Sequence, residues 1–209
     1  LPPVPFKRWI PIPRTTVDES NPEDPLKCRV VDDASRAGIN PCFQSSEKSK
    51  MHTLDDVIAT TLAVDSAWSG SFGTPCISKF DHEGAYKLYG YREQDLCLFV
   101  SITWNPQENR YEAWIQLSMI FGAIASVYGY LWVAAAVTAI MDLFFIFVVN
   151  YIDDYIMPEP DKTADSAIKV FKKVHDLIGI PLKHKKEVLK SKNCPVLGQG
   201  VEVQFEALF

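Results

Sequence analysis

The sequence predicts an α+β fold, in which an antiparallel sheet carries helices packed on one face. Two apolar, β-prone runs, 143–149 and 155–157, flank the acidic segment Tyr151–Asp154, and this order indicates a strand, a tight turn and a second strand. Directly after them, residues 163–178 are predicted to form an amphipathic helix, because their apolar side chains recur along one stripe. A hairpin followed by a separate helix favours this fold class.

The composition is that of a folded protein without a disulfide or zinc framework. The chain has 209 residues, of which 47% are hydrophobic and 22% are charged, and this fits one domain or two small ones. Its five cysteines are widely spaced and form no Cys-x-x-Cys pattern, so we expect a reducing intracellular compartment. The net charge of −5 counts against a bare nucleic-acid-binding module, which needs a basic face, since only 169–190 offers one.

The N-terminal part contains a proline-rich stretch, a short strand, a helix and a second strand. Residues 1–26 hold seven of the fourteen prolines and are expected to form an extended arm. Residues 27–40 are predicted to form a short strand that runs into a turn. A helix is predicted over 53–68, with Thr53 as its N-cap, and a strand over 75–81. The chain begins with Leu rather than Met, from which we expect a processed product or a fragment.

Two further strand pairs are predicted, and they complete the antiparallel elements. One consists of 96–104 and 110–117, which surround a turn at Asn105-Pro106. The other lies within 195–205 and is interrupted by glycines. We find no internal repeat.

The segment 113–141 contains no charged residue and has two interpretations. A run of about 20 apolar residues is long enough to span a bilayer. The soluble alternative is an edge strand followed by a helix that is buried on nearly all sides. Hydropathy alone leaves both open, and the α+β interpretation takes the second over 113–142.

Three carboxylates stand at the ends of predicted strands. Asp153 and Asp154 lie at the tip of the hairpin, and Asp81 ends the strand over 75–81. Paired aspartates are also common in ordinary turns, because their side chains bond the nearby backbone. Three carboxylates from two strands, however, are enough to bridge two divalent metal ions, since hard cations take oxygen ligands.

Six segments follow one another in a fixed order along the chain: Lys27 and Arg29 with Asp33; Asp81 with Tyr86; Phe121-Gly122 with Ser126; Tyr151-Ile152-Asp153-Asp154; 177–180 with Lys183, Lys185 and Lys186; and 196–198 with 201–203. In this order and spacing they resemble the motifs of the reverse transcriptases, the right-hand-shaped polymerases of retroelements. The resemblance implies an α+β fingers-and-palm unit with an antiparallel palm sheet. It implies an N-terminal arm over 1–26, partial fingers over 27–75, and a palm over 76–209 that ends at a primer-grip-like hairpin, with the thumb absent.

The resemblance also implies roles for the acidic and basic side chains. Asp81, Asp153 and Asp154 would hold two Mg²⁺ ions. Lys185 or Lys186 would protonate the pyrophosphate as it leaves.

A second group of residues would contact the incoming deoxynucleoside triphosphate. Lys27 and Arg29 would bind its phosphates, the lysine as a point charge and the arginine as a fork. Tyr86 would exclude a 2′-hydroxyl. Phe121, Gly122 and Ser126 would lie under the template and the nucleotide.

The function that follows is template-directed, Mg²⁺-dependent deoxynucleotidyl transfer to the 3′ end of a primer, with a nucleic-acid primer–template as partner. The alternative is a catalytically silent, retroelement-derived accessory subunit of a larger protein assembly. In that case the assembly could belong to an organelle membrane, with 113–141 as a transmembrane helix. Fold resemblance does not decide between the two, because activity depends on the site.

Overall fold

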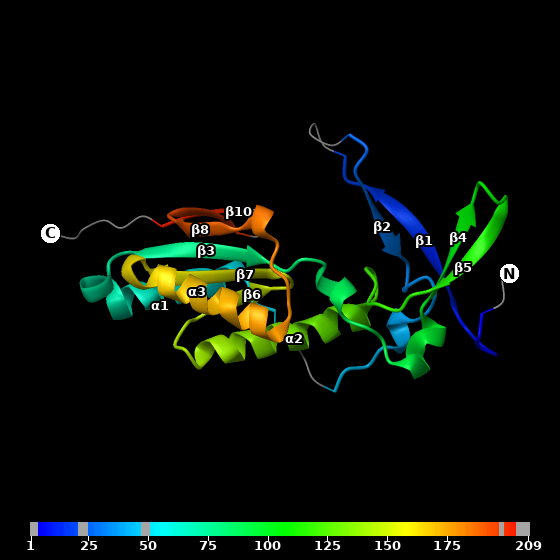
Figure 1. Cartoon of the computed structure of the whole chain (residues 1–209), viewed down its shortest axis with the longest axis horizontal. Coiled ribbons are helices and arrows are strands. Elements are labelled where there is room, and N and C mark those ends of the chain that lie inside the picture. The colour runs from blue at the N-terminus through cyan, green and yellow to red at the C-terminus, as the bar shows by residue number, and fades with distance from the viewer. Residues whose placement is uncertain (1–3, 21–24, 47–50, 197–198, 204–209) are drawn as a thin grey trace. The chain divides into compact units, whose positions relative to one another are not determined.

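The computed structural model describes residues 4–20, 25–46, 51–196 and 199–203 (Figure 1). The chain divides into two compact units. Unit 1 comprises Leu1–Lys48 and Gly84–Tyr130, and unit 2 comprises Ser49–Glu83 and Leu131–Phe209. Each unit is assembled from two separate stretches of the chain, because strands distant in the sequence pair within it.

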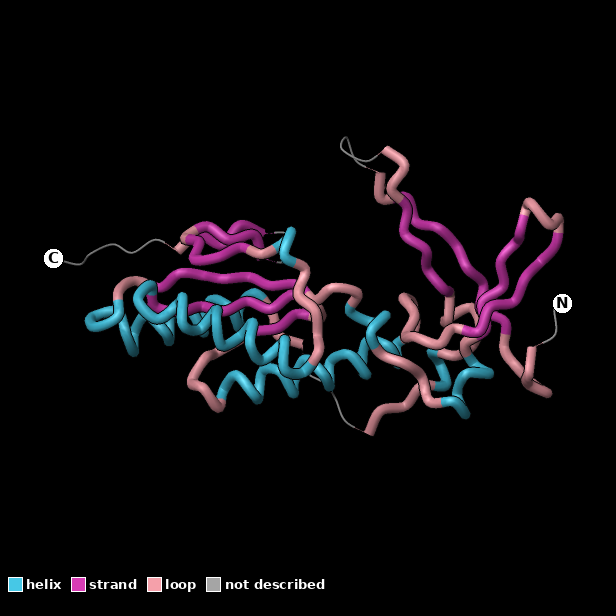
Figure 2. The backbone as a smooth tube through the Cα atoms, viewed as in Figure 1, coloured by secondary structure: helices cyan, strands magenta, loops and turns pink. Residues whose placement is uncertain are grey.

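Unit 1 is built on a four-stranded sheet in the order β2-β1-β4-β5. Its strands are β1 (Pro11–Asp18), β2 (Cys28–Asp32), β4 (Val100–Asn105) and β5 (Arg110–Ile115). β1 lies inside the proline-rich stretch for which an extended arm was expected. It pairs antiparallel with β2 and, over Pro11–Pro13 only, parallel with β4. The two hairpins diverge beyond this short pairing (Figure 2).

The core of unit 1 lies where the two hairpins meet. It consists of Ile12, Ala34, Ile39, Phe99, Ile120 and Ala123. Three short 3-10 helices, η1 (Asn40–Cys42), η2 (Ala85–Leu88) and η3 (Glu93–Leu98), connect the strands. The last of these occupies the start of the strand predicted over 96–104, so that strand begins at Val100 instead.

Unit 2 contains the second four-stranded sheet, in the order β6-β7-β3-β8. Its elements are α1 (Leu54–Phe72), β3 (Pro75–Asp81), β6 (Val149–Tyr151), β7 (Asp154–Pro160), α3 (Asp161–Ile178), η4 (His184–Lys186), β8 (Val188–Ser191), β9 (Asn193–Val196) and β10 (Gln199–Glu202). β9 and β10 form a separate antiparallel hairpin. Both α1 and α3 contact β3 and β7.

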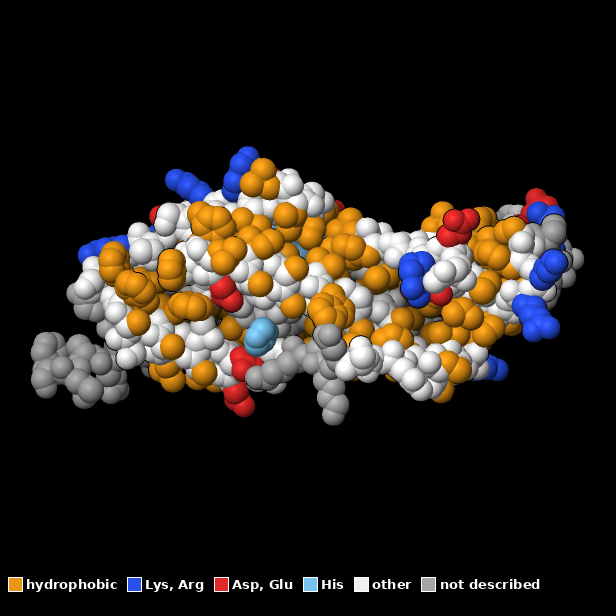
Figure 3. All heavy atoms as spheres, turned by 90° about the horizontal axis from the view of Figure 1, so that it is seen from below, with side chains coloured by type: hydrophobic (Ala, Val, Ile, Leu, Met, Phe, Trp, Pro, Cys, Tyr) orange, Lys and Arg blue, Asp and Glu red, His pale blue; other side chains and the backbone are white. Residues whose placement is uncertain are grey.

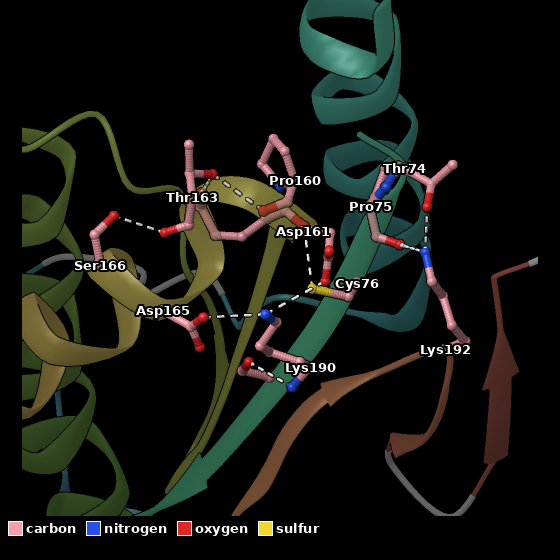
Figure 4. Close-up of polar contacts among 12 residues, drawn as sticks. Thr74, Pro75, Cys76, Pro160, Asp161, Thr163, Asp165, Ser166, Lys190 and Lys192 are labelled. Carbon is pink, nitrogen blue, oxygen red and sulfur yellow. Dashed lines mark hydrogen bonds and ion pairs between the residues drawn. The ribbon is translucent and has the colours of Figure 1, made fainter. Parts of the chain in front are cut away.

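The helices of unit 2 follow the sequence signals closely. The side chain of Asp56 accepts a hydrogen bond of 2.7 Å from the Thr53 backbone amide, so α1 begins where the cap was predicted. α3 buries the predicted stripe, Phe171 included, and ends at Gly179 in the left-handed conformation. Ile178 was expected in that stripe, but it is 41% exposed because the helix ends there. Lys190 of β8 binds Asp165 near the start of α3 (Figure 4).

The uncharged segment is not one continuous helix. Ala113–Ile115 end strand β5, and α2 (Ile124–Asp142) begins only after a loop. One side of α2 is buried, at Tyr130, Ala134, Val137 and Met141. The opposite side is exposed, with Trp132 at 54%, so the expectation of a helix buried on nearly all sides is wrong.

Among the described residues, α2 is the one helix with the length and composition of a membrane span, and 33% of its apolar window is buried. A core helix of a soluble protein meets the same criterion. The observation is therefore weak support for a membrane location.

The run 143–149 was predicted to be a strand, but only its last residue belongs to one. α2 extends to Asp142, and the chain then reverses through Phe145, whose φ of 56° is left-handed. Backbone amides of 145 and 146 bond carbonyls of the last helical turn, which ends the helix in the usual capping manner. The residues whose β-propensity predicted a strand therefore form the turn that caps α2 instead.

Candidate active site

The three predicted carboxylates meet at one end of the sheet in unit 2. Asp81, the last residue of β3, is the antiparallel register partner of Asp154, the first residue of β7. The backbone amide of His82 donates a 3.2 Å hydrogen bond to the carbonyl of Asp153. Strand register alone therefore brings together residues that stand far apart in the sequence.

The turn that carries Asp153 is a two-residue hairpin loop. Tyr151 and Asp154 are paired across it, so that Ile152 and Asp153 form the tip. Ile152 has φ 51°, a left-handed conformation that costs a β-branched residue about 1–3 kcal/mol. Such strain persists only where the surrounding strands impose it.

Two lysines neutralise two of the carboxylates. Lys186 of η4 places its Nζ 2.5 Å from Asp81 Oδ2, and no other described residue donates a hydrogen bond to this oxygen. Lys79 places its Nζ 2.9 Å from Asp154 Oδ2. η4 is held at the end of β3 because the amide of Lys183 donates to the carbonyl of Asp81 at 2.7 Å.

The remaining carboxylate experiences excess negative charge. Burial raises the pKa of Asp153, and the neighbouring charges of Asp81 and Asp154 raise it further, whereas Lys186 opposes them. The hydrogen bond to Asp81 raises the pKa of Lys186 in turn. The cluster as a whole therefore favours additional positive charge.

The residues fit a divalent cation in kind, although not as a finished cage. Among the described residues, no group of three Asp, Glu, His or Cys side chains lies close enough together to hold a metal ion. Carboxylate oxygens are nevertheless the ligands that Mg²⁺ prefers. Two of these carboxylates already hold a cation, the ammonium group of Lys186 or of Lys79. Loading a metal ion would require these ammonium groups to withdraw.

Of the two lysines predicted as proton donors, only one is at the carboxylates. Lys186 contacts Asp81, while Lys185 is exposed on the adjacent position of η4 and makes no ion pair with a described residue. Sequence reasoning missed Lys79. Its signal was strand alternation, since residues two apart in a strand share a face and Asp81 lies two positions on.

A cluster of aromatic and histidine side chains lies on the opposite face of β3. Phe80 stacks on Phe171 at 4.5 Å, and His82 stacks on Tyr155 at 4.4 Å between ring centroids. His175 Nδ1 lies 2.8 Å from a carbonyl oxygen and must donate to it, so its Nε2 accepts from His82 Nε2 at 2.9 Å. Burial lowers the pKa of His82 to about 3, and the neighbouring His175 adds to this shift.

The residues predicted to contact the triphosphate belong to unit 1. Lys27 immediately precedes β2 and Arg29 lies on it, and both pair with Glu19, the arginine at 2.7 Å. The Arg29 guanidinium lies 5.6 Å from the Phe121 ring centroid, and Tyr86 meets that ring edge-on at 5.1 Å. These predicted residues are therefore brought together.

A cavity of about 410 Å³ adjoins this group, lined by Arg14, Glu19, Cys28, Arg29, Val30, Asp32, Lys87 and Phe121. Arg14 and Lys87 were not predicted. Arg14 forms a 2.9 Å ion pair with Asp32. Its position in the proline-rich stretch gave no sequence signal for a binding role. The lining contains three cationic side chains, Arg14, Arg29 and Lys87, and two carboxylates that pair with the arginines, Asp32 and Glu19.

Gly122 and Ser126 have structural roles in unit 1. A Cβ at Gly122 would lie 2.1 Å from the Asp32 carbonyl oxygen, and its φ is 98°, so the glycine permits the approach of β2. Ser126 is buried, and its hydroxyl shares a 2.8 Å hydrogen bond with Tyr91. The places beside the nucleotide that the resemblance implies for both residues stay predictions.

The predicted primer-grip segment is described in part. β9 and β10 form the expected hairpin, and Leu197 and Gly198 lie outside the described residues. Lys79 Nζ lies 3.5 Å from the Pro195 carbonyl, so one side chain contacts both the acidic cluster and this hairpin.

Solved structures with the same fold were found by comparison. The foamy viral protease-reverse transcriptase in complex with ds DNA has a TM-score of 0.68 and 16% identity, covering 96% of this chain and 31% of that chain. The prototype foamy virus protease-reverse transcriptase CSH mutant has a TM-score of 0.67 and 17% identity, and the match covers 95% of this chain and 24% of that chain. Telomerase from Candida albicans, in complex with a TWJ fragment of telomeric RNA, has a TM-score of 0.61 and 12% identity. This match covers 94% of this chain and 46% of that chain.

No protein-family model matches the sequence, and no curated protein matches it. The chain spans 24% to 31% of the length of these foamy virus chains. At such low identity the likeness concerns the fold and not the activity. The resemblance to reverse transcriptases predicted from six motifs is confirmed at this level: the chain has the mixed α+β fold that foamy virus reverse transcriptase and telomerase share.

Proposed function

We propose that this chain catalyses template-directed, Mg²⁺-dependent addition of a deoxynucleotide to the 3′ end of a primer. The observation that carries the proposal is the register of β3 and β7, which aligns Asp81 with Asp154 and brings Asp153 beside them. A phosphoryl-transfer site needs such a cluster of carboxylates. The fold shared with reverse transcriptase and telomerase structures supports the same reading.

Asp81, Asp153 and Asp154 would hold the metal ions. Mg²⁺, when bound, supplies a lower pKa for the primer 3′-hydroxyl and neutralises the triphosphate and the leaving pyrophosphate. Lys186 is charged and adjacent to Asp81, so it is the better placed of the two predicted lysines to deliver a proton to pyrophosphate. An added cation would stabilise the charged form of Asp153, whose pKa is raised by burial.

In unit 1, Arg29 and Lys27 would bind the triphosphate after releasing Glu19. A polyphosphate carries more charge than one carboxylate and accepts the planar fork of arginine, so the exchange is favourable. Tyr86 would exclude a 2′-hydroxyl and thereby select deoxynucleotides; its buried ring is fixed edge-on against Phe121 and Tyr130.

The proposed partner is a primer–template duplex. Related structures contain foamy viral protease-reverse transcriptase with ds DNA or with an RNA/DNA hybrid, which supports a duplex of either kind. The net charge of −5 means that any duplex contact depends on local clusters of cations rather than on the whole surface.

A primer-extension assay tests the proposal. Asp153→Asn should reduce incorporation at least about a hundredfold, because removing a metal ligand costs no less than removing its supporting partner. Asp142→Asn removes one carboxylate from the exposed end of α2 and should leave incorporation unchanged. Equal incorporation by Asp153→Asn and the parent protein would defeat the catalytic assignment.

The second candidate is the accessory subunit without catalysis. One observation favours it, namely that α2 has the length and composition of a membrane span. If this role holds in a membrane, the protein should need detergent to stay monomeric, and sedimentation with and without detergent measures this. A monomer that remains in solution without detergent contradicts the membrane form.

A further inference from the structure

Unit 2 contains a cavity of about 290 Å³. It is bounded by α1, α3, the end of β7 and the segment after α2. Aromatic rings form much of its wall: Trp68, Phe72, Phe144, Phe145 and Phe147. All five are exposed, from 37% for Phe72 to 82% for Phe145. The face of unit 2 that carries α2 also shows many hydrophobic side chains (Figure 3). Exposed aromatic surface of this extent marks a binding site.

One acidic side chain lies in this aromatic wall. Glu159 of β7 is 7% exposed, and it is the one charged residue among the described residues that line the cavity. Thr163 donates a 2.9 Å hydrogen bond to its Oε2. No lysine, arginine or histidine lies in the wall to neutralise the carboxylate. A buried carboxylate without a cation is costly, and burial raises the pKa of Glu159 accordingly.

The surrounding backbone holds this arrangement in place. At the start of α3, the Thr163 hydroxyl lies within 3.1 Å of the Pro160 carbonyl, and the Ser166 hydroxyl donates to the Thr163 carbonyl at 2.7 Å (Figure 4). On the other wall, Phe145 keeps a left-handed backbone that a bulky residue seldom adopts. Its side chain lines the cavity and is the most exposed of the five aromatic residues.

We propose that this cavity binds the guanidinium group of an arginine side chain presented by a partner protein. Aromatic faces attract a cation, and the buried Glu159 offers it a carboxylate. Arginine suits the site better than lysine, because guanidinium is weakly hydrated, stacks on rings and forks onto carboxylates. The arginine stem would cover the apolar wall.

A matched pair of peptides tests the proposal. Acetyl-Leu-Arg-Leu-amide is titrated into the full chain and compared with its citrulline counterpart, in which a neutral ureido group replaces guanidinium. Binding is followed by the indole N–H signal of Trp68 in two-dimensional NMR, assigned by its loss in Trp68→Phe. The arginine peptide should bind at least about fivefold more tightly, the contribution of one cation–π contact.

Three variants sharpen this test. Glu159→Gln keeps an acceptor for Thr163 and should reduce the preference for arginine over citrulline to the share that the aromatic rings supply. Asp142→Asn removes the same charge outside the cavity wall and should preserve the preference. Phe145→Asn suits the left-handed backbone and should weaken binding of both peptides while retaining the fold, so it tests the site even if Glu159→Gln fails to fold.

Other outcomes would overturn the proposal. Equal binding of the two peptides to the parent protein would make the cavity merely apolar. Self-association on concentration that Glu159→Gln abolishes would identify a second copy as the occupant. Sedimentation with neutral phosphatidylcholine vesicles, unaffected by Glu159→Gln, would identify a lipid surface. This inference is independent of polymerase activity, which none of these measurements uses.

Discussion

Near its C-terminal end, strand β3 carries different chemistry on its two faces. One face carries Lys79 and Asp81, which are charged and paired to neighbouring ions. The other carries Phe80, which is buried against Phe171, and beyond the strand end His82 joins the same cluster. Alternation along a strand makes this possible, because successive side chains point to opposite faces. Consecutive residues of one strand therefore provide both the charged groups and the packed aromatic side chains that support them.

The largest effect should follow from removing support. Phe171→Ala would leave a cavity between Phe80, Tyr155 and His175, which contact its ring. We expect the free energy of unfolding to fall by about 3–5 kcal/mol, measured by chemical denaturation. A loss below about 1 kcal/mol would show that the support is not close-packed.

A pH effect of intermediate size should come from His82. Its pKa lies near 3 in the folded chain but at the ordinary 6.5 when unfolded, so the unfolded chain binds the proton more readily. Stability is therefore complete above pH 6.5 and declines as the pH falls towards 3. Between pH 6.5 and 5 the loss should reach about 2 kcal/mol.

Thermal unfolding at a series of pH values measures this effect. His82→Asn should flatten the curve over that range, at some cost in overall stability. An unchanged slope would assign the pH dependence to other groups.

A smaller effect of opposite sign should come from the hairpin tip. Ile152→Gly relieves the left-handed strain and should raise the free energy of unfolding by about 1 kcal/mol. Part of that gain is offset by the greater freedom of glycine in the unfolded chain. Denaturant unfolding measures the change, and a net loss would show that the isoleucine side chain contributes more than its backbone costs.

The smallest effect should concern the charged face itself. Lys79→Met removes the ammonium from Asp154, so we expect Mn²⁺, as a reporter for Mg²⁺, to bind roughly threefold to fivefold more tightly. Calorimetric titration measures the affinity without substrate. Lys173→Met, on the exposed side of α3, is the matched control and should leave the affinity unchanged. Weaker Mn²⁺ binding by Lys79→Met would refute competition between lysine and metal.

Sequence reasoning located the strands and the turn that carry the acidic cluster, because these rest on local signals. The predicted bounds of β3 match the structure, and α1 and α3 differ from prediction mainly at their ends. The pairing of β3 with β7, which aligns Asp81 with Asp154, is a non-local contact, and the sequence indicated it through the resemblance rather than through local signals. The ion pairs made by Lys79 and Lys186 depend on side-chain reach and could not be predicted in the same way.

The features that short sequence windows did not reveal arise from neighbouring structure. The apolar run 143–149 has β-propensity, yet most of it reverses direction after α2 because the helix must be capped. The close approach of Gly122 to the backbone of β2 depends on a partner distant in the sequence, and its predicted contact with the nucleotide stays a prediction.

The chain crosses between its two units at residues 48–49, 83–84 and 130–131. During synthesis β3 is complete at residue 81 and must wait for β7, which begins at residue 154, before its central hydrogen bonds can form. Closing so long a loop is slow, and an unpaired hydrophobic strand is exposed to aggregation meanwhile. Simple truncation at either end would remove a strand from one unit without releasing the other, so obtaining either unit alone requires its two chain segments to be joined directly by a linker.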